Sequence, residues 1–272
     1  MGNHRDPLQV LMFNYFFCMI FSLADVLLSG SHRIFFSGFS VWMPFAACLG
    51  VLYLLNFSLT EKTVRFAGAA VSSVAAKLSL VLPFCYTLIL QQQIPDGFSM
   101  AALLICLPAI ILISGKSQSP ASENQSSATW ILPGAVFIGS GLTDIFTQWL
   151  NQALVPQADA AGMVLLVFTA AFFSALGLML FRQFKTGKSI DFSTVLPGFL
   201  LGLPNFISYK SILASLNAFH HQGNLVFPVA NLGVIVFTTL VSTFWFREKL
   251  SRQNMTGIFL AILALILFFQ KG

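Results

Sequence analysis

The chain has 272 residues, of which 57% are hydrophobic and only 8% are charged. A soluble domain usually carries about a quarter charged residues, so nine acidic and fourteen basic side chains cannot cover a soluble globule of this size. The composition therefore excludes a soluble protein and predicts an all-α, polytopic membrane protein. The net charge of +5 lies mostly in short loops and indicates membrane orientation rather than nucleic-acid binding.

Long apolar runs follow one another from end to end, and a run of about 18 or more such residues is typical of a transmembrane helix. We expect nine helices, over about 8–29, 38–59, 64–91, 97–115, 128–154, 158–182, 193–217, 219–246 and 254–270. The two longest of them, 64–91 and 219–246, are expected either to tilt or to kink at Pro83 and Pro228. The polar, serine-rich segment 116–127 reads as a linker between two halves.

A shift of 155 residues aligns four spans of the first half with four spans of the second. Residues 8–29 fall on 163–184, 38–59 on 193–214, 64–91 on 219–246, and 97–115 on 252–270. Such duplication is typical of secondary transporters, so we expect a four-helix repeat over 1–115 and a five-helix repeat over 128–272. The counterpart of 128–154 would lie before Met1, and we therefore expect a late start or the natural loss of an opening helix.

Two short motifs and the repeat suggest a family. Residues 246–268 combine a Glu-Lys-Leu-Ser step, a glycine nine residues after Glu248, and a final apolar helix; the first half has Gln93 and Ala102 at the matching places. With "FNYFF" and "GLTDIF" in the expected opening helices of the two halves, the pattern resembles the EamA-type permeases of the drug/metabolite transporter superfamily. The resemblance covers essentially the whole chain. It implies a carrier of small metabolites with ten helices in two inverted repeats, and this chain departs from it by lacking the first helix.

The resemblance further implies a central cavity lined mainly by the helices over 64–91 and 219–246. Basic residues gather on one side of a nine-span arrangement, which places the N-terminus and the linker in the cytoplasm and the C-terminus outside. The bases on that side are Arg5, Lys62, Arg65, Lys116, Arg182, Lys185, Lys188, Arg247, Lys249 and Arg252, against Arg33 and Lys271 on the other. Compact loops and family habit point to a bacterial inner membrane.

Lys77 lies at the middle of the 64–91 run, where its ammonium group cannot easily reach either interface. A lysine at the bilayer centre costs about 3 kcal/mol on insertion scales. The side chain must therefore face the protein interior, a wet cavity or a counter-ion. We expect either a site for a substrate anion or coupling ion, or a structural ion pair.

Asp144 is the candidate counter-charge for Lys77, and it belongs to a polar stripe on one face of the 128–154 helix. The stripe consists of Ser140, Asp144, Thr147, Gln148 and Asn151. Five polar residues in register predict a lined cavity, with hydrogen bonding between helices as the alternative. The 219–246 helix carries a second stripe, made of Asn224, Pro228, Asn231, Thr238 and Ser242. Asn231 aligns with Ala76, next to Lys77, and is either a substrate contact or an ordinary buried amide.

Four further residues lie in the apolar runs. Lys210 is either functional or reaches an interface with its long stem. Asn205, after Pro204, marks a broken helix or a simple kink. Asn14 shares a helical face with Asp25, which we expect at an interface, and is a further candidate for lining the cavity. The substrate-binding candidates are Lys77, Asp144, Asn231, Gln148, Asn205, Lys210, Asn14 and Asn224.

Catalytic signatures are missing from the sequence: it has no HExxH, GxSxG or Walker motif. His220 and His221 form a loop pair without further ligands nearby, and the four cysteines lie in apolar runs without CxxC spacing. We therefore expect no enzyme, no cofactor and no metal site. The expected function is secondary transport of a small polar or anionic metabolite by alternating access. A coupling proton or ion and a homodimer are left open, and the alternative is a truncated, non-transporting relative that acts as a subunit or receptor.

Overall fold

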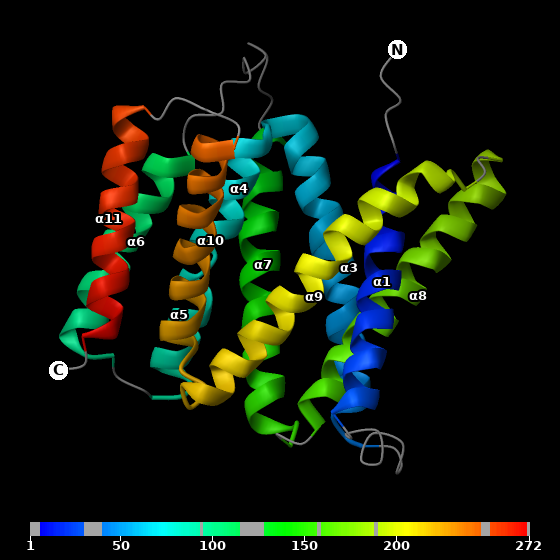
Figure 1. The fold of residues 1–272 in the computed structure, drawn as a ribbon, viewed down its shortest axis with the longest axis horizontal. Coiled ribbons are helices and arrows are strands. Elements are labelled where there is room, and N and C mark those ends of the chain that lie inside the picture. Colours follow the sequence, from blue (N-terminus) through cyan, green and yellow to red (C-terminus); the bar gives the residue numbers. More distant parts are fainter. Residues whose placement is uncertain are drawn as a thin grey trace. The chain divides into compact units, whose positions relative to one another are not determined.

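The protein is described by a computed structural model over residues 6–29, 40–92, 95–114, 128–156, 159–187, 190–245 and 251–270. In this part of the chain the regular elements are all helices (Figure 1). They are α1 (Pro7–Leu28), α3 (Met43–Ala67), α4 (Ala69–Leu78), α5 (Val81–Ile89), α6 (Gly97–Ser114), α7 (Ala128–Ala153), α8 (Ala160–Thr186), the 3₁₀ turn Phe192–Thr194, α9 (Val195–Ala218), α10 (Gly223–Trp245) and α11 (Arg252–Phe269). The all-α prediction is confirmed for these residues. The predicted linker and the Glu-Lys-Leu motif lie outside them.

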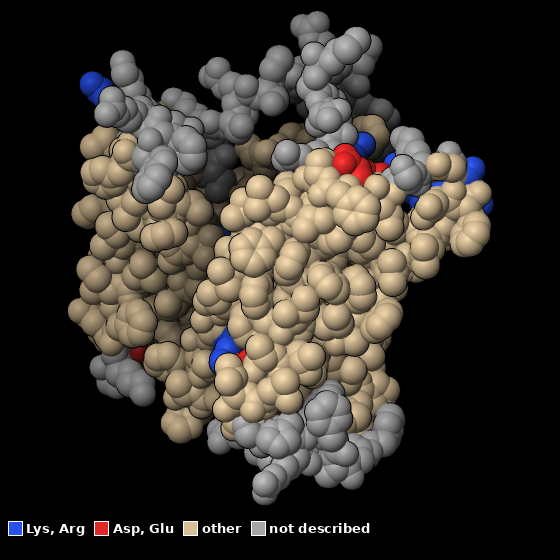
Figure 2. Space-filling model, turned by 45° about the vertical axis from the view of Figure 1, so that its right-hand side comes forward, with Lys and Arg blue, Asp and Glu red and all other residues tan. Residues whose placement is uncertain are grey.

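Seven stretches of the described chain are long and apolar enough to cross a membrane. They are Pro7–Leu28, Met43–Ala67, Ala69–Ile89, Ala160–Lys185, Phe192–Ala218, Gly223–Val241 and Arg252–Phe269. Large apolar side chains such as Leu104, Phe237 and Phe259 are exposed, and charged side chains are sparse on the face in Figure 2. A soluble protein rarely exposes so much apolar surface. The helices are those of an integral membrane protein.

The prediction of one helix over 64–91 is wrong, because two local features interrupt it. Gly68 has a φ of +90°, which ends α3 and starts α4; glycine adopts this conformation without steric cost. Pro83 has no N–H to donate to Ser79, and the Leu82 N–H bonds the Ser79 carbonyl instead at 2.8 Å. The second interruption therefore separates α4 from α5 at residues 79–80, directly after Lys77.

The chain forms two compact units, each built from two separate parts of the sequence. Unit 1 contains Met1–Ser58 and Phe146–Asn217, and unit 2 contains Leu59–Ile145 and Ala218–Gly272. The helices α3 and α7 each contribute one part to unit 1 and the other part to unit 2.

In unit 1, helices approach each other closely at glycine residues, where a larger side chain would not fit. A Cβ atom added to Gly50 of α3 would lie 2.2 Å from the Val167 carbonyl oxygen of α8. Gly198 and Gly202 of α9 are similarly close to Phe13 and Asn14 of α1. Small residues at such spacing allow helix backbones to pack together in a membrane, where lipid supplies no hydrophobic drive between helices.

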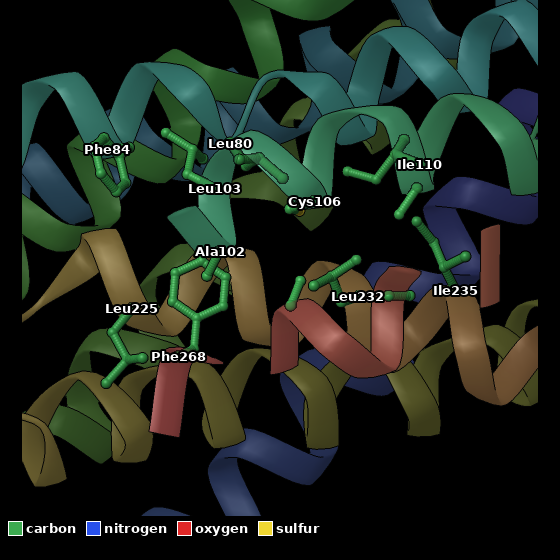
Figure 3. Close-up of a cluster of buried hydrophobic side chains, with 13 residues drawn as sticks. Leu80, Phe84, Ala102, Leu103, Cys106, Ile110, Leu225, Leu232, Ile235 and Phe268 are labelled. Atoms are coloured by element: carbon green, nitrogen blue, oxygen red, sulfur yellow. The ribbon is translucent and has the colours of Figure 1, made fainter. Parts of the chain in front are cut away.

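Unit 2 has an apolar core contributed by α4 to α6, α10 and α11. Figure 3 shows Leu80, Cys106 and Leu232 among the side chains gathered there. Gly257, near the start of α11, packs on Ile113, near the end of α6: a Cβ atom there would lie 2.6 Å from the isoleucine side chain. The helices α6 and α11 therefore run antiparallel.

Candidate functional site

Lys77 lies in the last turn of α4, in unit 2, and is half-buried. Its Nζ atom donates a hydrogen bond to the Oδ1 atom of Asn231 at 3.1 Å. Asn231 lies on α10, near the middle of the apolar stretch Gly223–Val241, and Lys77 lies near the middle of Ala69–Ile89. The repeat predicted from the sequence would place these two residues at adjacent equivalent positions, and in the structure their side chains are in direct contact.

Asp144 belongs to the part of α7 that lies in unit 2, and its carboxylate is within electrostatic range of the Lys77 ammonium group. The two groups do not form a close ion pair. Within the described residues, ion pairs of 4 Å or less join Arg65 to Glu61, Arg182 to Asp6, and Lys210 to Asp25. The ammonium group therefore has an amide as its direct partner and a carboxylate as a more distant counter-charge.

A close helix contact lies one turn before Asp144 on α7. A Cβ atom added to Gly141 would lie 2.3 Å from the Leu82 side chain, so α7 touches α5 only because residue 141 is glycine. Residues three apart lie on the same side of a helix, so Asp144 lies on the side of α7 that Gly141 brings against α5. Leu82 follows Lys77 by five residues, across the break between α4 and α5.

Asn224 is the fourth candidate in unit 2 and lies in the first turn of α10, buried. Its Oδ1 atom has no hydrogen-bond partner in the described part of the chain. Asn224 and Asn231 are seven residues apart, about two turns of one helical face. This buried acceptor is the second polar group that α10 places along that face.

The remaining candidates lie in unit 1, so the eight predicted residues fall into two sets. The buried Asn14 of α1 accepts a hydrogen bond from Asn205 of α9, at 3.4 Å. α9 is continuous through Pro204, which contradicts a broken helix there. Lys210 pairs with Asp25 of α1 at 2.5 Å. Gln148 is fully buried on the unit 1 part of α7.

The polar stripe of α7 serves two purposes along its length. Asp144 faces Lys77 in unit 2, whereas the residues that follow it bond to other helices of unit 1. Thr147 is within 3.2 Å of the Tyr53 hydroxyl of α3. Asn151 donates to Asn217 of α9 at 2.8 Å. For Thr147 and Asn151 the structure thus supports the alternative of hydrogen bonding between helices.

Three features of these sites were missed by sequence reasoning. Asp25 and Asn217 are partners of Lys210 and Asn151, but they lie 185 and 66 residues away in sequence, and no local pattern pairs them. Gly141 could have been found, because it precedes Asp144 by one helical turn within "GLTDIF". A glycine on the polar face of an apolar helix signals a close helix contact.

The histidine pair lies in the turn between α9 and α10, with both residues at positive φ. Burial, and then the neighbouring His220, lower the pKa of His221, which favours the neutral ring. Among the described residues no group of three or more His, Cys, Asp or Glu side chains is placed to hold a metal ion.

Comparisons with known proteins identify a similar fold but assign no function. No family model matches the chain. A Haemophilus influenzae protein, described as an uncharacterized protein, is 25% identical over 260 residues, which cover 94% of this chain and 86% of the relative. A solved crystal structure of a protein is 14% identical with a TM-score of 0.72, over 98% of this chain and 90% of that chain. The chain shares its fold with that solved protein.

Proposed function

We propose that the protein is a secondary membrane transporter of the EamA type, which moves a small polar or anionic metabolite by alternating access. The observation that carries this proposal is the contact between Lys77 and Asn231, with Asp144 in electrostatic range, near the middle of apolar helices. Ionisable groups at membrane depth are rare and mark substrate or ion pathways. A bacterial inner membrane is the proposed location.

The internal duplication is supported by the core of unit 2. Under the 155-residue shift, side chains of this core fall on other side chains of the same core. The pairs are Leu80 and Ile235, Val81 and Val236, Ile105 and Leu260, Cys106 and Ala261, Ala109 and Ala264, Ile110 and Leu265, and Ile113 and Phe268. A core that maps onto itself is expected of two repeats related by a pseudo-twofold axis.

The direction of the helices supports inverted rather than parallel repeats. α6 and α11 are equivalent under the shift and run antiparallel, as the contact of Gly257 with Ile113 requires. Unit 1 has the same relation: Asp6 at the start of α1 pairs with Arg182 near the end of α8. A twofold axis that relates antiparallel helices lies perpendicular to them. Such an axis in the membrane plane is the symmetry of inverted-repeat transporters.

The repeat also indicates that the charge at Lys77 has a purpose other than packing. Its equivalent in the second half is Leu232, which is fully buried, and the equivalent of Asn231 is Ala76. Equivalent places in the two halves therefore hold apolar side chains in one case and a hydrogen-bonded ammonium group in the other. We assign Lys77 to attracting a carboxylate or phosphate, Asn231 and Asn224 to orienting it, and Asp144 to balancing the charge.

Thermal stability and transport test this proposal with the purified full chain. The unsubstituted protein should be stabilised by small carboxylates or by inorganic phosphate, because ligand binding raises stability by mass action. Lys77→Leu should remain folded and lose this stabilisation, and uptake of the same anions into proteoliposomes should fall at least tenfold. Lys185→Leu is the matched control, because it removes an exposed lysine at the end of α8 and should change neither result.

Full transport by Lys77→Leu would remove Lys77 from the site. A protein that neither binds nor moves any of these anions would overturn the proposal and favour a non-transporting membrane subunit or receptor.

A further inference from the structure

We propose that Asp144 carries the coupling proton, so that each singly charged substrate anion binds together with one proton and crosses the membrane with it. This inference rests on the proposed function and adds the coupling ion and the charge class of the substrate. The carboxylate takes up the proton by forming an O–H bond on the side where substrate enters. It releases the same proton where substrate leaves, so that charge and atoms balance over the cycle.

The empty site is already neutral, and this neutrality limits what can bind. Lys77 supplies one positive charge and Asp144 one negative charge. The elements near Asp144 offer few other charges: α10 has no titratable side chain in Gly223–Trp245, and α5 carries only Cys85 and Tyr86. The Lys77 ammonium is the charge that acts on Asp144.

An anion that binds Lys77 would face Asp144 across the same ammonium group. Two negative charges against one positive charge, among apolar helices, repel each other and are poorly solvated. A proton on Asp144 removes this repulsion. The protonated site then holds one ammonium group and one monoanion, which is again neutral. A dianion would need a second proton acceptor, and none of the groups just named near Asp144 supplies one.

The Lys77 ammonium group has N–H donors that can bind an anion without breaking a contact with Asp144. A lysine ammonium group has three N–H donors, and one of them is used on the Asn231 side chain. Because Asp144 is not within ion-pair distance in the described structure, no direct N–H···O contact with it has to break when an anion arrives. The carboxylate acts on the site through its charge, and its protonation state decides whether a second negative charge is tolerated.

The test measures anion affinity against pH on the full chain in nanodiscs, with lactate and gluconate as probes, because both stay singly charged over the pH range used. Proton and anion binding are reciprocally linked, so the affinity for a monoanion should weaken up to tenfold per pH unit once Asp144 is ionised. In Asp144→Asn the affinity should persist and become independent of pH. Asp25→Asn is the matched control, because it neutralises another acid that partners a lysine and should keep the slope.

The possible results separate the two proposals. A pH slope that persists in Asp144→Asn, with binding intact, overturns the proton role and leaves the transporter proposal standing. If Asp144→Asn does not fold, Asp144→Glu is measured instead. A shift of its affinity-against-pH curve along the pH axis supports the inference. An unchanged curve overturns it. No binding of any probe by the unsubstituted protein overturns the proposed function, and the inference with it.

Discussion

At the scale of single residues, the hydrogen bond between Lys77 and Asn231 is a polar contact near the middle of two apolar helical stretches. If the proposed repeat holds, the equivalents of the two residues are Leu232, which is fully buried, and Ala76, so the corresponding place in the other half holds apolar side chains. Under the 155-residue shift, residue 76 corresponds to residue 231 and residue 77 to residue 232. The proposed symmetry therefore maps the contact between residues 77 and 231 onto the neighbouring pair 232 and 76. The hydrogen bond joins α4 to α10, and under the proposed symmetry it would lie near the pseudo-twofold axis of unit 2.

Removing one partner of this contact should cost more stability than removing both. Asn231→Ala leaves the half-buried ammonium group without its direct acceptor, which we expect to lower the free energy of unfolding by about 1–3 kcal/mol. The double variant Lys77→Leu with Asn231→Ala carries the same residue types as the equivalent pair, and its melting temperature should match or exceed that of the original. Thermal melts of the three proteins in one detergent provide the comparison. A double variant less stable than Asn231→Ala alone would contradict this.

The amide pair of unit 1 should behave as structural hydrogen bonding. Asn151 and Asn217 are joined at 2.8 Å between α7 and α9. We expect a coupling energy of about 0.6–1.7 kcal/mol in a double-mutant cycle of the two alanine variants, as for other hydrogen bonds in membrane proteins. Anion affinity should not change in any of them. A loss of anion binding in Asn151→Ala with stability unchanged would instead place this residue in a binding site.

At the scale of elements, the sequence predicts where helices lie better than where they break. Most helices match the apolar runs within a few residues, because length and hydropathy determine a span. The kink expected at Pro83 corresponds to the break between α4 and α5. The break at Gly68 could not be predicted, because a glycine in an apolar run is equally compatible with a continuous helix.

Gly68 supplies a testable case of backbone conformation. A Cβ atom added there would meet nothing within 4 Å, so a substitution acts through the positive φ of +90° and not through a clash. Gly68→Ala should therefore lower the free energy of unfolding by about 1–3 kcal/mol, because this φ with a ψ of 157° is a conformation that is essentially restricted to glycine. Gly134→Ala in α7 is the control, since that position is also open and lies within a helix, where alanine is favoured. Equal melting temperatures for both variants would show that residue 68 does not need glycine.

At the scale of the whole molecule, the two repeats predicted from the sequence do not coincide with the two compact units of the structure. The repeats were predicted as residues 1–115 and 128–272, whereas each compact unit takes helices from both halves. The two divisions are compatible, because α6 and α11, which the predicted repeat makes equivalent, pack against each other. Sequence periodicity identifies related helices, but partners such as Asp25 and Lys210 depend on packing that no single run encodes. This is why the sequence can nominate candidate residues but cannot predict how they group.

The proposed pseudo-twofold axis leads to a prediction about the site as a whole. If a cation near this axis is what recognises an anion, moving it from Lys77 to the equivalent position should restore part of the binding. We expect Lys77→Leu with Leu232→Lys to recover stabilisation by lactate or phosphate, at lower affinity because Ala76 replaces Asn231 as the neighbour. Lys77→Leu with Ile235→Lys should not recover it, because residue 235 lies about one turn further along α10 and corresponds under the shift to Leu80, not to Lys77. Recovery in both variants would mean that any lysine on α10 suffices, and the repeat symmetry would then explain nothing about recognition.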